Sequence, residues 1–61
     1  MAYEFEVYQD KSKEKRWRWR LNSSNGRIVA DSGQGYSSKQ SCLDAVDRVK
    51  ANTRAATVTE L

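Results

Sequence analysis

The first half of the chain alternates between apolar and charged residues one position at a time, and this feature most limits its fold. From Arg16 to Leu21, every second residue is tryptophan or leucine, and an arginine stands at each position between. The segment from Tyr3 to Val7 has the same pattern with glutamates in place of arginines. Because successive side chains of a strand point to opposite faces, the alternation predicts two strands that each bury one face.

A turn and a third strand follow this pattern. Asn25-Gly26 is a preferred central pair for a two-residue type I′ hairpin turn. The register that this turn predicts pairs Ser24 with Arg27, Leu21 with Ala30, and Arg20 with Asp31. One face of the sheet then gathers five apolar residues: Trp17, Trp19, Leu21, Ile28 and Ala30. A one-residue slip would move every side chain to the other face, so the agreement between turn and pattern supports the register.

The connection between the first two strands lies in the polar stretch from Gln9 to Glu14. An even register, such as Phe5 opposite Trp19, keeps the apolar residues of both strands on one face. The sequence determines this parity and leaves the pairing itself open. In that example the two glutamates of the first strand lie near the arginines of the second: Glu4 near Arg20, and Glu6 near Arg18.

A helix is expected after Gly33-Gln34-Gly35, beginning near Ser37 or Ser38. With Ser37 as the N-cap, Gln40 stands at N3 and completes a capping box. Helical spacing then gives one apolar stripe, formed by Cys42, Ala45, Val46 and Val49. This stripe is expected to cover the apolar face of the sheet.

Two smaller features complete the predicted order. Asp44 and Arg48 stand four residues apart on the helix, which predicts an ion pair. Leu43 lies beside the apolar stripe and is a candidate contact with a partner. The tail from Ala55 to Leu61, which contains Thr57, Val58 and Thr59, is a candidate fourth strand. The order β-β-β-α-β predicts an α+β fold, with an antiparallel sheet and one helix packed on one face.

Composition restricts how such a short chain is stabilised. A chain of 61 residues buries only about 60% of the surface that its unfolded form exposes. Such small domains usually need an additional source of stability, such as a disulfide, a metal or a partner chain. One cysteine and no histidine exclude an internal disulfide and a four-ligand zinc site. Self-association is therefore the expected source of additional stability. No metal and no cofactor are expected. The lack of a long apolar segment or signal peptide, together with one unpaired cysteine, predicts a cytoplasmic protein without membrane contact.

Several motifs run in order along the chain: Phe5-Glu6-Val7-Tyr8, Arg16 to Leu21, Asn25-Gly26, Gly33-Gln34-Gly35-Tyr36, Ser38-Lys39, Cys42 and Val49-Lys50. In these motifs the chain resembles the YegP-like family of small uncharacterised bacterial and archaeal proteins. It departs from the family pattern at Gln34, where an acidic residue is expected, and in a slightly long connection over Asp10–Lys15. The resemblance implies one YegP-like domain over residues 1–61. It also implies a homodimer in which two units form one continuous sheet and exchange their C-terminal strands, but it implies no activity.

The arginine face is the first candidate site. It could neutralise phosphates of RNA or single-stranded DNA, through Lys15, Arg16, Arg18 and Arg20. Sheets that bind single strands usually offer aromatic rings on the same face, and here the tryptophans point the other way. Glu4, Glu6 and Asp31 also offset the arginines. A solvated, charge-balanced face is therefore the favoured interpretation.

The other candidates are also weighed against structural roles. An anion could bind at the start of the helix, through Gly35, Ser37, Ser38 and Lys39, although the spacing matches no phosphate-loop pattern. Trp17 and Trp19 could form a ligand platform, but their alternation favours the core. Cys42 lacks a histidine to activate it and is expected to be a buried structural thiol.

No acid/base pair or nucleophile stands out, so the expected function is a non-enzymatic homodimeric interaction or structural module. The alternative is weak nucleic-acid binding by the arginine face. An enzyme, with a pocket shared at the dimer seam, is the third class.

Overall fold

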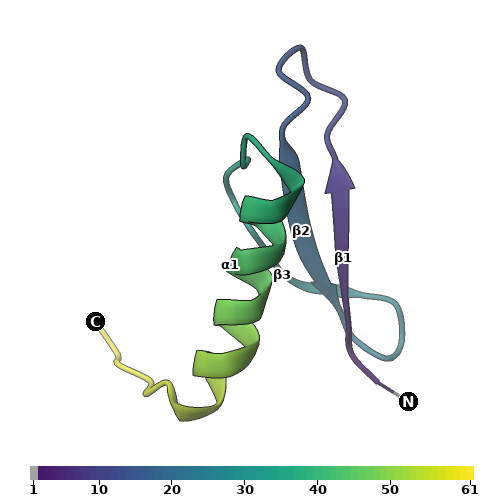
Figure 1. The fold of residues 1–61 in the computed structure, drawn as a ribbon. Helices are drawn as coiled ribbons and strands as arrows, with labels where there is room; N and C mark the ends of the chain where they lie inside the picture. Colours follow the sequence, from purple (N-terminus) through teal and green to yellow (C-terminus); the bar gives the residue numbers. More distant parts are fainter. Residues whose placement is uncertain (1) are drawn as a thin grey trace.

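Three strands form one antiparallel sheet in the computed structural model, which describes residues 2–61. The strands are β1 (Glu4–Gln9), β2 (Trp17–Asn22) and β3 (Ile28–Asp31), and they lie in the order β1-β2-β3. The helix that follows them lies against one face of the sheet (Figure 1). The predicted α+β class, with one helix on an antiparallel sheet, is therefore confirmed.

The first hairpin has the predicted parity and a different register. Phe5 pairs with Leu21, and Val7 pairs with Trp19, so the apolar residues of both strands share a face. Glu6 pairs with Arg20 rather than with Arg18, two positions away from the register given as an example. Side-chain alternation determines parity alone, because a shift of two residues leaves every side chain on its own face.

The second hairpin confirms two predicted pairs, Arg20 with Asp31 and Leu21 with Ala30, but its turn is wider than predicted. Gly26 N donates to Ser23 O at 2.9 Å, and Gly26 has a φ of 87°, whereas Asn25 does not have the positive φ that a type I′ turn requires. Ser23, not Ser24, bonds the backbone of Arg27. The Asn25 side chain favours this wider turn, since its oxygen accepts from Ser23 Oγ and from Arg27 N.

The wider turn moves Ile28 out of the predicted apolar face. The register shifts between Leu21 and Asn22, and Ile28 pairs with Asn22. Directly paired residues lie on the same side of a sheet, so Ile28 shares a side with Asn22 rather than with Leu21. Its side chain is 57% exposed and does not join the core.

Beyond β3 the chain continues along β2 toward the helix. Ser32 N donates to Trp19 O at 2.9 Å, and Trp17 and Tyr36 exchange two backbone hydrogen bonds of 2.8 Å. Gly33 has a φ of 71°, which glycine adopts without steric cost. This path delivers the chain to the end of the sheet where β1 and β2 are connected, and the helix begins there (Figure 1).

The helix α1 spans Lys39–Asn52 and begins one residue later than the capping box predicts. Ser38 is the N-cap, and its Oγ accepts from Ser41 N at 3.1 Å. The predicted box of Ser37 and Gln40 is wrong, because the backbone at Ser38 is the extended residue before the helix, with φ −132° and ψ 152°.

The side chains that follow the cap also pair differently from the prediction. Gln40 Nε2 donates to Asp44 Oδ1 at 3.0 Å, within one helical turn. Asp44, which was expected to pair with Arg48, thus accepts a hydrogen bond from a residue nearer the helix N-terminus. An amide and a carboxylate four residues apart interact as favourably as an exposed ion pair, so spacing alone does not choose between them.

The core lies between α1 and the tryptophan side of the sheet, as predicted. Trp19, Cys42 and Val46 are buried, and Phe5 meets Trp19 edge to face with ring centroids 5.6 Å apart. The partly buried residues around them are Val7, Trp17, Leu21, Tyr36, Ala45 and Val49. The assignment of both tryptophans to the core is confirmed.

The C-terminal tail does not contact the sheet as a strand within this chain. A short 3-10 helix, Thr53–Ala55, follows α1, and residues 56–61 then run away from the sheet (Figure 1). Val58 is 95% exposed. The segment predicted as a fourth strand is therefore unpaired here. None of the helices formed within residues 2–61 has the length and apolarity needed to cross a bilayer.

Candidate functional site

The arginine row of the sheet is neutralised pair by pair. The described residues form three ion pairs: Arg16 Nε with Glu14 at 2.6 Å, Arg18 Nε with Asp10 at 2.8 Å, and Arg20 Nε with Glu6 at 2.7 Å. Of the four predicted nucleic-acid residues, Lys15 and Arg16 lie in the loop before β2, and only Arg18 and Arg20 lie on the sheet. Nucleic-acid binding by this row stays a prediction, and phosphates would have to compete with three carboxylates.

Asp10 organises the connection between β1 and β2. Its carboxylate accepts from Ser12 Oγ at 2.5 Å, Ser12 N at 3.1 Å, Arg16 N at 3.2 Å and Arg18 Nε at 2.8 Å. The hydrogen bond from the Ser12 hydroxyl and then the Arg18 guanidinium lower the pKa of Asp10 to about 2. The sequence identified Asp10 only as a loop residue, because its partners become adjacent only when the hairpin closes.

Glu6 has a similar role on the outer face of the sheet. It accepts from Arg20 Nε and Asn22 Nδ2, both at 2.7 Å, and these bonds lower its pKa, with Arg20 the larger cause. The Arg20 guanidinium also lies 4.9 Å from the ring centroid of Tyr8. Tyr8 was not predicted on the arginine face, although extending the alternation of β1 by one residue places it there.

The predicted anion site surrounds the start of α1, at Gly35, Ser37, Ser38 and Lys39. Ser38 is occupied as the N-cap, and the Lys39 ammonium lies 5.7 Å from the ring centroid of Trp17. Gly35 lies against the side chain of Arg16, where a Cβ on residue 35 would approach Arg16 Cβ to 2.5 Å. The structure thus brings Gly35 of the predicted anion site against Arg16 of the predicted nucleic-acid site, and anion binding stays a prediction.

Cys42 is fully buried on the inner side of α1. Burial raises the pKa of its thiol, which disfavours the reactive thiolate. Its position therefore supports the structural role predicted for it. In the described chain, no three side chains of histidine, cysteine, aspartate or glutamate are grouped so that they could hold a metal ion.

An open groove of about 610 Å³ lies between the sheet and the C-terminal half of α1. Its apolar lining comes from Tyr3, Phe5, Leu21, Ala30, Val46 and Val49. Trp19 also lines it, and Trp19 Nε1 is buried without a hydrogen-bond partner among residues 2–61. Sequence patterning did not predict this groove, because the pattern gives the apolar face but not how much of it one helix covers.

The fold and these surfaces define a class: a small α+β domain with one helix on a three-stranded sheet, a charge-balanced outer face and an incompletely covered apolar face. Residues 7–60 match the family described as a domain of unknown function, DUF1508, and the chain belongs to this family.

Relatives of similar length occur in bacteria and archaea. A UPF0339 protein of Neisseria meningitidis serogroup B is 47% identical over 57 residues, covering 93% of this chain and 96% of the relative. A UPF0339 protein of Treponema denticola is 41% identical, and the alignment covers 100% of this chain and of the relative. A UPF0339 protein of Methanosarcina acetivorans is also 41% identical, and the alignment covers 88% of this chain and 88% of the relative. The resemblance to a small uncharacterised bacterial and archaeal family is confirmed, and nothing in these names indicates a specific activity.

A solved structure has the same fold. The NMR solution structure of a protein from Haloferax volcanii aligns with a TM-score of 0.85 at 43% sequence identity. The alignment covers 98% of this chain and 97% of that one. The unit formed by β1, β2, β3 and α1 is therefore shared with an archaeal relative.

Proposed function

We propose that this protein is a cytoplasmic, non-enzymatic homodimeric module with an interaction or structural role, in which the two chains exchange their C-terminal tails. Each tail would lie as an added strand on the sheet of the other chain. The absence of histidine and the burial of the single cysteine support a non-enzymatic role.

The surface area of the single chain is the observation that carries this proposal. The chain exposes 5242 Å², whereas a folded monomer of 7.0 kDa is expected to expose about 4,000 Å². Its radius of gyration is 12.7 Å, against about 10.5 Å for a compact domain of this length. The excess of about 1,200 Å² resembles the share that one partner contributes to a large protein interface.

The position of the excess surface points to the tail and the sheet edge. Val58 and Leu61 are the most exposed large apolar side chains of the described chain, and Ile28 and Val29 of the edge strand β3 are more than half exposed. Unpaired edge strands readily accept another strand. An exchanged tail would supply that strand and cover these side chains.

The groove beside α1 gives the second support. Its lining is apolar, and the buried Trp19 Nε1 lacks an acceptor among residues 2–61. A buried donor without an acceptor costs about 1–3 kcal/mol. A segment of the second chain lying in this groove could cover the apolar lining and offer a backbone carbonyl to Trp19.

Substitutions in the tail test the proposal without disturbing the rest of the chain. Val58→Asp with Leu61→Asp changes two side chains that are almost fully exposed in one chain. We expect sedimentation at micromolar concentration to show a dimer for the original protein and a large shift toward monomer for the double variant. Deleting residues 56–61 should have the same effect and destabilise the fold.

The matched control is Glu60→Gln, which alters a tail residue without placing a charge on an apolar position. It should remain as dimeric as the original protein. A stable folded monomer of the original sequence, or an unchanged dimer in the double variant, would contradict the exchange.

A further inference from the structure

Half of the eight basic residues that form no ion pair in the described chain lie at one end of the molecule. Arg16, Arg18 and Arg20 are each paired with a carboxylate. Four lysines near them form no ion pair in the described chain, and we call them the basic tip: Lys11, Lys13 and Lys15 of the β1–β2 loop, and Lys39 at the start of α1. The net charge of the whole chain is only +3, so the tip carries more positive charge than the whole molecule.

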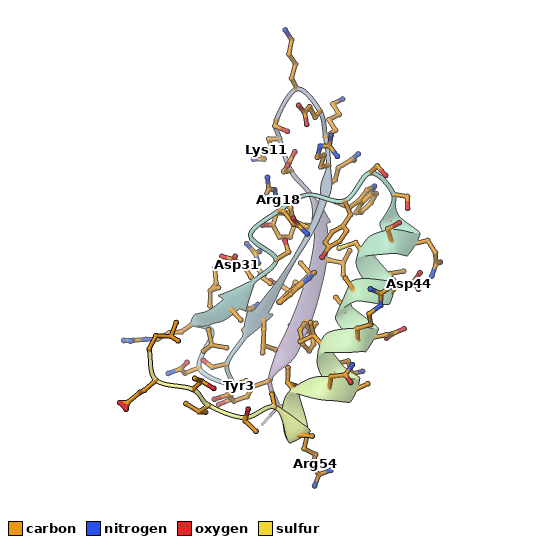
Figure 2. All side chains as sticks on the ribbon, turned by 90° about the vertical axis from the view of Figure 1, so that its left-hand side faces the viewer. Tyr3, Lys11, Arg18, Asp31, Asp44 and Arg54 are labelled. Carbon is orange, nitrogen blue, oxygen red and sulfur yellow. The ribbon has the colours of Figure 1, made fainter. Side chains whose placement is uncertain are left out.

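The fold brings these lysines to the same end. The loop that carries Lys11 and the start of α1 both lie at the end opposite Tyr3 and Arg54 (Figure 2). Trp17 connects the two parts, because it pairs with Gln9 beside the loop and its ring lies 5.7 Å from the Lys39 ammonium. The loop lysines and Lys39 therefore lie at the same end of the molecule although Lys39 is distant in sequence.

The loop is held in one shape before any ligand binds. The Asp10 carboxylate accepts from the backbone N–H groups of Ser12 and Arg16. Lys15 N donates to Ser12 O at 3.1 Å, and Gln9 Nε2 donates to Lys15 O at 2.8 Å. Lys15 has a φ of 48°, the only positive φ at a non-glycine residue in the described chain. Strained backbone of this kind persists where surrounding bonds enforce it and is concentrated at functional sites.

We propose that the basic tip binds the phosphodiester backbone of single-stranded nucleic acid through its four lysines. Basic side chains that contact successive phosphates supply most of the sequence-independent affinity for such ligands. The loop from Asp10 to Arg16 contains no apolar side chain that could insert into a membrane. This site differs from the arginine row and does not depend on the homodimer, because the tip lies at the end opposite Tyr3 of the groove (Figure 2).

The salt dependence of binding tests the site quantitatively. Fluorescence anisotropy would measure the affinity of the full-length protein for labelled single-stranded RNA and DNA oligonucleotides over a range of salt concentrations. Four phosphate contacts predict a slope of log K against log salt of about −2.8, since each contact contributes about −0.7. Replacing Lys11, Lys13 and Lys15 with glutamine should leave a slope of about −0.7 and weaken low-salt binding about 10-fold or more.

The matched control removes the same charge elsewhere. The triple variant of Arg27, Arg48 and Arg54 to glutamine should retain the affinity and slope, and so should Arg20→Gln in the arginine row. Circular dichroism would verify the fold of every variant. The lysine variants should fold, because the loop is held by backbone groups and by Asp10.

Four outcomes would overturn the proposal. The first is no binding of either oligonucleotide at low salt, and the second is an equal loss in both triple variants, which would indicate net charge alone. The third is a loss in Arg20→Gln without a loss in the lysine variant. The fourth is tighter binding to polyglutamate or to anionic phospholipid vesicles than to the oligonucleotides, which would assign the tip to an acidic protein or a membrane surface.

Discussion

Asp10 shows how a single side chain can determine the shape of a loop. The connection from β1 to β2 contains no glycine, yet Lys15 is held at a positive φ. The Asp10 carboxylate compensates by accepting from two backbone N–H groups, one hydroxyl and the guanidinium of Arg18. The charged form of Asp10 is therefore part of the folded structure of the hairpin.

This gives the hairpin a defined acid sensitivity. The pKa of Asp10 falls from 3.8 to about 2 on folding, so the unfolded chain binds more protons between these values. The stabilisation is complete above the unfolded pKa and is lost as the pH falls through the folded pKa. We expect the free energy of unfolding in urea to decrease as the pH falls from about 4 to about 2. Glu6, whose pKa is also lowered, contributes in the same direction.

Asp10→Asn separates this contribution from general acid effects. The variant should be less stable at neutral pH, and its stability should depend less steeply on pH in the acid range. Asp47→Asn on the exposed side of α1 is the control and should keep the original slope. An unchanged slope in Asp10→Asn would contradict the assigned role.

At the scale of the elements, neighbouring residues of the same type compete for one structural position. Ser37 and Ser38 are both suitable N-caps, and Ser38 takes the position in the structure. The backbone pairing of Tyr36 with Trp17 holds the chain just before this point. The local sequence allows either serine as the N-cap, and in the structure the use of Ser38 occurs together with this long-range contact with β2.

Two alanine substitutions test this assignment of the cap. Ser38→Ala should cost about 1 kcal/mol of unfolding free energy, because Ser41 N loses its acceptor in the first turn of α1. Ser37→Ala should have little effect, since Ser37 does not cap the helix. Urea denaturation of both variants provides the comparison, and a larger cost at Ser37 would contradict the observed helix start.

At the scale of the whole molecule, the sheet and the helix do not enclose a core of ordinary size. Within residues 2–61, three residues are buried, and the groove beside α1 leaves part of the apolar face open. A 61-residue chain has few ways to compensate, since its single cysteine and lack of histidine exclude an internal disulfide and a structural zinc site. The proposed association with a second chain would add buried area.

The proposed dimer predicts that thermal stability depends on protein concentration. Dissociation and unfolding are coupled when the folded monomer is marginal, so the melting temperature should rise with total concentration. The chain lacking residues 56–61 should melt lower and show no such dependence. Melting curves followed by circular dichroism over a wide concentration range provide the test, and a constant melting temperature for the original chain would contradict coupled dimerisation.

The sequence by itself determined which residues face inward. Period-two alternation placed Trp17, Trp19 and Phe5 on one face, and helical spacing added Cys42 and Val46, because these periods are properties of the backbone alone. Four of these residues also belong to the motifs that carried the family resemblance: Phe5, Trp17, Trp19 and Cys42. It also followed that the arginines would lie outside the core, which the ion pairs confirm.

Only the tertiary structure decided how the elements meet and what each charged group contacts. The register of the first hairpin, the bulge that moves Ile28, the N-cap at Ser38 and the ring of partners around Asp10 all depend on groups distant in sequence. A shift of two residues or a change of cap preserves the hydrophobic pattern, so the pattern cannot choose among these arrangements. Bonds between distant groups make that choice, and they separate the neutralised arginine row from the unpaired lysines of the basic tip.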